Sequence, residues 1–138
     1  MKAFILVTTL FSFSLIACPD LSGDYQCTEE GESYKMTITQ TGHNFSITDD
    51  EGTSELIADE NVYPFVEENF NGGYIAGCDN QNLAFEIAGD LTDEEGTVSL
   101  QVQGLFEKTA SGMKMTVQTT VDLEPKEVFT SLTSCQKL

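Results

Sequence analysis

The sequence predicts an all-β protein, an antiparallel meander of about eight strands that closes into a small up-and-down barrel. Apolar side chains recur at every second position after residue 17, as in Tyr34, Met36 and Ile38. This period is typical of a strand with one buried and one solvated face. Turn sequences rich in Gly, Asn and Asp separate the runs at hairpin spacing. A flat meander of this many strands exposes two edges, and closure removes both of them.

The strands follow one another along the chain with short turns between them. We expect them at roughly 21–28, 33–40, 44–49, 53–58, 74–78, 83–88, 97–107, 113–121 and 128–135. The expected turns are 41–43, 49–52, 79–82, 89–96 and 111–112. Residues 59–73 contain Pro64 and break the alternation, which predicts a long loop. Gly104 interrupts a long strand and predicts a bulge or a bend of the barrel.

Residues 1–17 carry one Lys, no carboxylate and an apolar run that is shorter than the roughly 20 residues of a membrane-spanning helix. This pattern predicts a secretory signal peptide, followed by a single domain at 18–138. The segment 15–18 resembles the lipobox of bacterial lipoproteins, which implies an acylated Cys18 as the only membrane contact. A competing cleavage after 12–14 would instead leave Cys18 as a thiol. Either route leads to the periplasm, cell envelope or exterior of a bacterium.

Four cysteines, Cys18, Cys27, Cys78 and Cys135, predict disulfide bonds in an oxidising compartment. We favour Cys78 with Cys135 and Cys18 with Cys27, because the first bond closes a long loop and fastens the terminal strand. The second choice joins Cys27 to Cys135, which a barrel permits because its first and last strands are neighbours. No two cysteines are separated by two residues, so a redox pair or a thiolate metal site is disfavoured.

The composition excludes several functions. The chain has 23 acidic residues against 6 basic ones, all of them Lys, and a formal charge of −17. Nucleic acids and anionic lipid headgroups are therefore poor partners. His43 is the only histidine and falls in a turn, so a catalytic triad or a common zinc site is not expected. The acidic clusters at 49–51, 67–68 and 93–95 lack EF-hand spacing. We expect no enzyme activity, no cofactor and no metal.

The interior of the barrel is the remaining place for a site. If the register is as expected, six aromatic side chains project inward: Tyr25, Tyr34, Phe45, Tyr74, Phe85 and Phe106. They could line a pocket for a small apolar ligand or fill the interior completely. The short chain favours a filled core.

Two resemblances bear on function. The segment 21–25, Leu-Ser-Gly-Asp-Tyr, resembles the opening of lipocalins with Tyr in place of Trp, although the chain has no Arg to match the lipocalin Arg that packs on it. This resemblance implies a barrel that carries a small hydrophobic molecule, with a bridge from a mid-chain to a C-terminal Cys. The segments 25–27 and 134–136 are similar to the cysteine-bearing first and last strands of small exported inhibitors of lysozyme. The segment 111–114 departs from the internal motif of those inhibitors.

We therefore expect a non-enzymatic, exported, acidic β-barrel binding module. Its charge exceeds what solubility requires and favours docking of a cationic protein, in the manner of an inhibitor. The alternative is a lipocalin-like carrier of a small hydrophobic ligand. We expect a monomer.

Overall fold

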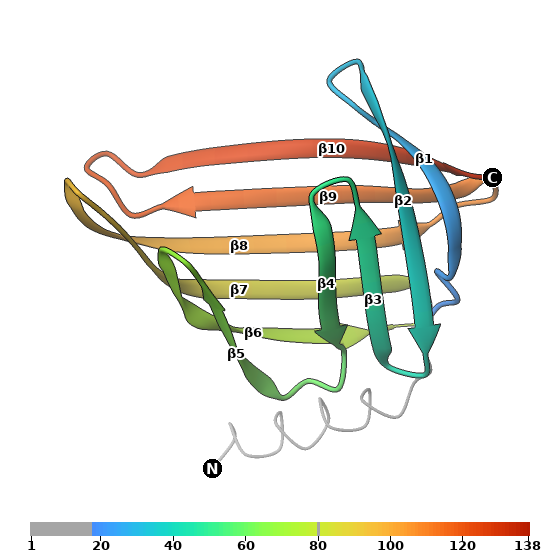
Figure 1. Cartoon of the computed structure of the whole chain (residues 1–138), viewed down its shortest axis with the longest axis horizontal. Helices are drawn as coiled ribbons and strands as arrows, with labels where there is room; N and C mark the ends of the chain where they lie inside the picture. The colour runs from blue at the N-terminus through green and yellow to red at the C-terminus, as the bar shows by residue number, and fades with distance from the viewer. Residues whose placement is uncertain (1–17, 80) are drawn as a thin grey trace, which may run out of the picture.

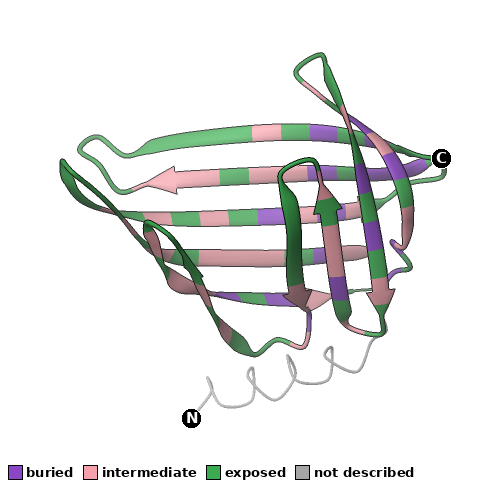
Figure 2. Ribbon diagram, viewed as in Figure 1, coloured by how far each residue is buried: buried purple, intermediate pink, exposed green. Residues whose placement is uncertain are grey.

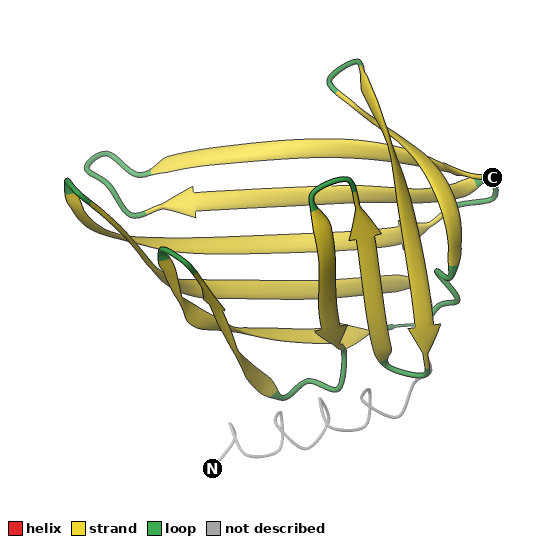
Figure 3. Cartoon of the chain, in the orientation of Figure 1, coloured by secondary structure: helices red, strands yellow, loops and turns green. Residues whose placement is uncertain are grey.

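The structure is a computed structural model that describes residues 18–79 and 81–138. The expected signal peptide at 1–17 lies outside the described residues. The described chain consists of strands and their connecting turns (Figure 3), and it contains no helix that is long and apolar enough to cross a membrane.

Ten antiparallel strands form one sheet, so the expectation of an all-β antiparallel meander is confirmed. The strands are β1 (Gly23–Glu29), β2 (Glu32–Thr41), β3 (Asn44–Asp49), β4 (Gly52–Ile57), β5 (Val62–Glu67), β6 (Phe70–Cys78), β7 (Asn82–Asp93), β8 (Gly96–Lys108), β9 (Gly112–Val121) and β10 (Glu127–Lys137). Their order in the sheet is β4-β3-β2-β1-β10-β9-β8-β7-β6-β5. The first and last strands of the chain are therefore neighbours in the middle of the sheet.

The sheet curls into a half-barrel rather than a closed barrel. Strands β6 to β10 lie side by side as one layer, and β1 to β4 cross steeply over part of it (Figure 1). β4 and β5 are the two end strands and do not pair with each other. The chain passes between the layers in a few residues, held by hydrogen bonds from Ala58 N to His43 O and from Glu60 N to Ala76 O, both 2.8 Å. After this short link β5 pairs with β6 and not with β4, so the two ends of the sheet do not join. The expected full closure of the barrel is therefore wrong.

The strand count also exceeds the expected eight, because residues 59–73 are not a loop. They contain β5 and the beginning of β6, which form a hairpin. Pro64 is tolerated there because β5 is an edge strand and needs only one line of ladder hydrogen bonds. Gly72 allows β6 to approach β7, since a Cβ at this position would lie 2.1 Å from the carbonyl oxygen of Ala88.

Strand β7 is longer than expected. It continues through residues 89–90 to Asp93, and the turn that follows is confined to 93–96. The Asp93 carboxylate accepts hydrogen bonds from the N–H groups of Glu95 and Gly96, at 2.7 and 3.1 Å. Asp49 closes the β3–β4 turn in the same way with Glu51 and Gly52. These acidic residues therefore stabilise hairpins, which accounts for part of the acidic clusters.

The core lies where the two layers cross. Its largest fully buried side chains are Phe45, Leu21, Leu83, Met113 and Cys27. The buried residues concentrate on the parts of β6 to β10 that lie under β1 to β3, as the purple segments in Figure 2 show. The apolar side chains of the alternating strands are thus fully buried only where a second layer covers them.

The expected pairing of the cysteines is wrong in its first choice. Cys18 is bonded to Cys78, and Cys27 is bonded to Cys135. The second choice, Cys27 with Cys135, is confirmed because β1 pairs with β10 and these two residues lie directly opposite each other. The first choice failed because it treated the C-terminal strand as a free end, whereas β1 already holds it in the middle of the sheet.

Gly104 does not mark a bulge. The β7–β8 register runs without interruption from Asn82 opposite Glu107 to Asp93 opposite Gly96. Gly104 lies opposite Phe85, and a Cβ on it would lie 2.1 Å from two carbons of the Phe85 ring. The glycine therefore provides the space in which this ring packs, with its centroid 5.7 Å from that of Phe106.

Peptide mapping of the oxidised protein without reductant should recover Cys18 linked to Cys78 and Cys27 linked to Cys135. The Cys18 peptide should carry no acyl chain, because its sulfur is already bonded. Replacing Cys27 and Cys135 together by Ala should lower the free energy of unfolding by about 4 kcal/mol, since this bond spans 108 residues of the unfolded chain. Recovery of a Cys18–Cys27 peptide would contradict the structure.

Gly104→Ala should destabilise the protein by about 1–3 kcal/mol in chemical denaturation, because its new methyl group overlaps the Phe85 ring. In a double-mutant cycle, Phe85→Ala should remove most of this additional loss by removing the ring. Purely additive effects of the two substitutions would show that the ring does not need the glycine.

Candidate functional site

The inner face of the β6–β10 layer is defined by the strand register. Leu83 and Phe106 are opposite each other and buried in the core, so the residues at every second position from them also point inward. The inward positions of β7 to β10 carry no charged side chain over most of each strand. These stretches are 83–91 on β7, 98–106 on β8, 113–121 on β9 and 129–135 on β10. The outward positions include Glu86, Asp90, Gln101, Gln103 and Gln118.

Only one half of this inner face is covered. Under β1 to β3 the inward residues are buried, as at Met113 and Met115. Further along the same strands the inward residues remain partly exposed, and Phe129 is 57% exposed. We name this second half the open inner face. Its residues are Leu91, Val98, Leu100, Val102, Val117, Thr119, Val121, Phe129 and Ser131.

Three acidic turns border the open inner face. The β5–β6, β7–β8 and β9–β10 turns meet at this end of the layer (Figure 1), where Thr92 N bonds Asn69 O and Asp122 N bonds Ser99 O. We name their eight carboxylates the acidic rim: Glu67, Glu68, Asp93, Glu94, Glu95, Asp122, Glu124 and Glu127. Lys126 is the one cation in these three turns. An apolar surface and a band of negative charge are therefore adjacent.

The six aromatic residues expected in the interior all point inward. Tyr25, Phe45, Tyr74 and Phe106 are buried, whereas Tyr34 and Phe85 are partly buried and pack against the core. The Tyr25 hydroxyl donates a hydrogen bond of 2.6 Å to Leu21 O, and burial raises the pKa of this phenol. These rings fill the covered half, as the short chain suggested, and they do not line the open inner face.

His43 lies beside the Cys18–Cys78 disulfide. Its Nδ1 is 3.2 Å from Cys18 Sγ and 3.1 Å from Ala58 O. Ligand atoms of His43 and the two cysteines fall within 4.8 Å of one another. Zinc binds thiolates, and both sulfurs are consumed in the S–S bond, so the oxidised protein does not present this set to a metal. The histidine instead packs the β2–β3 turn against the interlayer link.

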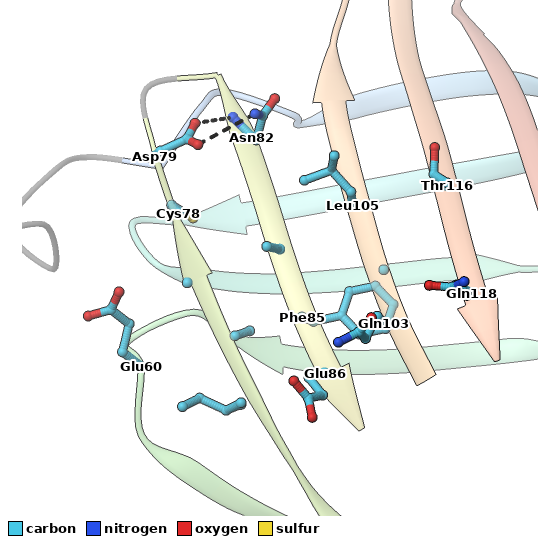
Figure 4. Close-up of a pocket in the computed structure, with 15 residues that line it drawn as sticks. Glu60, Cys78, Asp79, Asn82, Phe85, Glu86, Gln103, Leu105, Thr116 and Gln118 are labelled. Carbon is cyan, nitrogen blue, oxygen red and sulfur yellow. Dashed lines mark hydrogen bonds between the residues drawn. The ribbon is translucent and has the colours of Figure 1, made fainter. Parts of the chain in front are cut away.

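A shallow groove of about 820 Å³ lies on the opposite, outer face of the same layer. Figure 4 shows it as an open surface on which Glu60, Glu86, Gln103 and Gln118 project from neighbouring elements. Ile75 and Leu105 contribute apolar area to its lining. Gln101 Nε2 donates a hydrogen bond of 2.6 Å to Glu86, so this carboxylate already has a partner. Charged and amide side chains lie among the apolar ones in this groove, whereas the open inner face carries no charged side chain.

Asp59 and Tyr63 fasten the link between the layers. The Tyr63 hydroxyl donates a hydrogen bond of 2.5 Å to Asp59 Oδ2, and the Tyr63 ring stacks on Tyr74 with centroids 5.6 Å apart. The hydrogen bond from Tyr63 holds the pKa of Asp59 below its ordinary value and raises the pKa of the phenol. The ionised carboxylate therefore helps to position β5 against β6.

The open inner face was not anticipated as a site. The alternation of Val98, Leu100 and Val102 is visible in the sequence and predicts a strand. It does not show which part of that strand a second layer covers. A scan against protein-family models and a search of curated proteins found no match to this chain.

Tyr63→Phe should raise the pKa of Asp59 toward its ordinary value, because it removes the largest cause of the depression. The stability lost by this variant should be greatest at neutral pH, where Asp59 is ionised. The loss should shrink as the pH falls below about 3.9, where an unperturbed Asp protonates. NMR titration of the carboxyl carbon and pH-dependent unfolding test this. Tyr34→Phe should leave the Asp59 titration unchanged, and an identical shift in both variants would contradict the assignment.

Proposed function

We propose that this protein is an exported, acidic, non-enzymatic binding module that docks a cationic protein partner. An amphipathic helix of the partner lies with its apolar side on the open inner face and its basic side chains toward the acidic rim. The observation that carries the proposal is an uncharged and uncovered sheet surface that ends at eight carboxylates. Monomeric proteins rarely leave a contiguous apolar surface without a partner.

The size of the open inner face favours a helix as the occupant. The residues of the open inner face lie on the four strands β7 to β10, which span three interstrand spacings, about 14 Å, and the five residues from Val98 to Val102 span about 17 Å along the strands. A helix with its side chains is about 10–12 Å across, so it fits this width. A single extended chain occupies only about 4.8 Å and would leave most of the surface wet.

The distribution of charge favours a cationic partner. Among the lysines of residues 18–138, four lie on strands or turns at the covered end and Lys126 lies at the open end; the four are Lys35, Lys108, Lys114 and Lys137. The potential around the open inner face is therefore negative, which accelerates encounter with a basic partner and repels acidic ones.

The two disulfides support an oxidising, exported compartment. The apolar run at 1–17 supports export by a signal peptide. A lipocalin-like carrier of a small hydrophobic molecule remains the alternative, since the same apolar surface could hold one. That alternative requires neither the acidic rim nor a wide surface.

The direct test uses two designed helical peptides with the same Leu positions, one with Lys and one with Glu on the polar side. Isothermal titration calorimetry should detect binding of the Lys peptide to the oxidised protein, weakening as salt is added. The Glu peptide should not bind. Equal binding of both peptides, or binding of an apolar dye but of neither peptide, would overturn the cationic partner.

Matched variants locate the site. Leu100→Glu adds a charge to the open inner face and should abolish binding of the Lys peptide, although it makes the protein more acidic. Gln118→Glu adds the same charge on the outer face of the neighbouring strand and should retain binding. Leu100→Ser repeats the test without a charge, and circular dichroism checks the fold of each variant. Loss of binding in Gln118→Glu alone would place the site on the outer face.

A further inference from the structure

Strand β10 has a free edge next to the point where β1 leaves it. β10 pairs with β9 from Glu127 to Gln136, but with β1 only from Ser134 to Lys137. Residues 127–133 therefore have no strand on their second side within the described chain. Figure 1 shows the β1–β2 hairpin turning away from β10 at this place.

The alternation of an antiparallel ladder identifies which backbone groups are free. Leu138 N bonds Asp24 O toward β1, and Lys137 N bonds Ser111 O toward β9. Even-numbered residues of β10 therefore direct their N–H and C=O groups toward the side of β1. At Val128, Thr130 and Leu132 these groups face no strand. The side chains of Val128 and Leu132 are 54% and 58% exposed.

The other edge strands carry features that prevent pairing, and this one does not. β5 contains Pro64, and β4 contains Glu55 in its middle. Charges and prolines on edges are the usual protection against pairing with another chain. From Val128 to Gln136, β10 has neither a charged residue nor a proline. An unprotected edge of this kind is a ready template for an additional strand.

We propose that the free edge of β10 pairs with β10 of a second copy of this chain, antiparallel and with the two-fold axis at Thr130. The free span 127–133 is centred on this residue. Val128 then lies opposite Leu132 of the second copy, and Thr130 lies opposite Thr130. Both are favourable cross-strand pairs. Val128, Thr130 and Leu132 each donate and accept one hydrogen bond, so every free backbone group of the edge is used.

The same register brings a favourable charge to the ends of the interface. The new pairing ends at Glu127 opposite Thr133, because Thr28 of β1 already pairs with Ser134. Lys126 of the second copy therefore comes next to the place where β1 leaves toward its acidic turn at Glu29 and Glu30. The net charge of each copy still opposes association. Salt screens this repulsion, so dimerisation strengthens as salt is added. Binding of a cationic helix weakens as salt is added. The opposite responses to salt therefore distinguish dimerisation from binding of the helix.

This inference is independent of the proposed function and replaces the expectation of a monomer. Sedimentation velocity of the oxidised protein over a range of concentrations should show a monomer–dimer equilibrium that shifts toward dimer in high salt. Thr130→Pro removes the N–H that faces the free edge and leaves the β9 ladder intact. It should weaken dimerisation by at least about tenfold.

The controls distinguish loss of pairing from loss of fold. Thr130→Val retains the N–H and should dimerise like the original protein. Leu132→Lys should weaken the dimer, whereas Gln118→Lys, opposite Thr130 on β9, should not. If Thr130→Pro fails to fold, as judged by circular dichroism, the Leu132→Lys comparison decides alone. A protein that stays monomeric in high salt, or a dimer that neither substitution affects, overturns the proposal.

Discussion

The short ladder between β1 and β10 is the connection on which the rest of the structure depends. It joins the layer of β1 to β4 to the layer of β5 to β10 through only four residue pairs. Cys27 and Cys135 bond covalently across it, and Cys18 and Cys78 hold the layers together at a second place. The two cross-links close spans of 60 and 108 residues and restrict the unfolded chain, which reinforces this short ladder.

The shortness of that ladder has two consequences, one for a face of the sheet and one for a strand edge. Because β1 and β2 turn away after four pairs, they cover only half of the inner face, and the other half stays open. For the same reason the first part of β10 retains an unpaired edge. The open inner face and the free edge therefore have one structural cause. They differ in their chemistry, since one is an apolar surface beside carboxylates and the other is a row of backbone groups.

Charge and hydrophobicity are separated in this protein along two directions. Across the layer, uncharged side chains point inward while most acidic and amide side chains point outward. Along the layer, most lysines lie at the covered end, and the acidic rim lies at the open end. Several of the acidic residues also close hairpin turns, as Asp49 and Asp93 do. A strongly acidic composition thus serves local structure and, at the open end, creates a surface that selects for basic partners.

The sequence by itself determined the all-β class, most of the strands and the turn at 49–52. Period-two alternation and turn chemistry are local properties that a reader of the chain can recognise. The sequence could not determine the hairpin within residues 59–73, the space that Gly104 leaves for Phe85, or the pairing of the four cysteines. Each of these depends on residues that are distant in the chain. Only the tertiary structure decided that the sheet stays open and that Leu100 stays partly exposed while Phe106 is buried. Both residues belong to one alternating strand, and the difference arises solely from where β1 to β4 cross it.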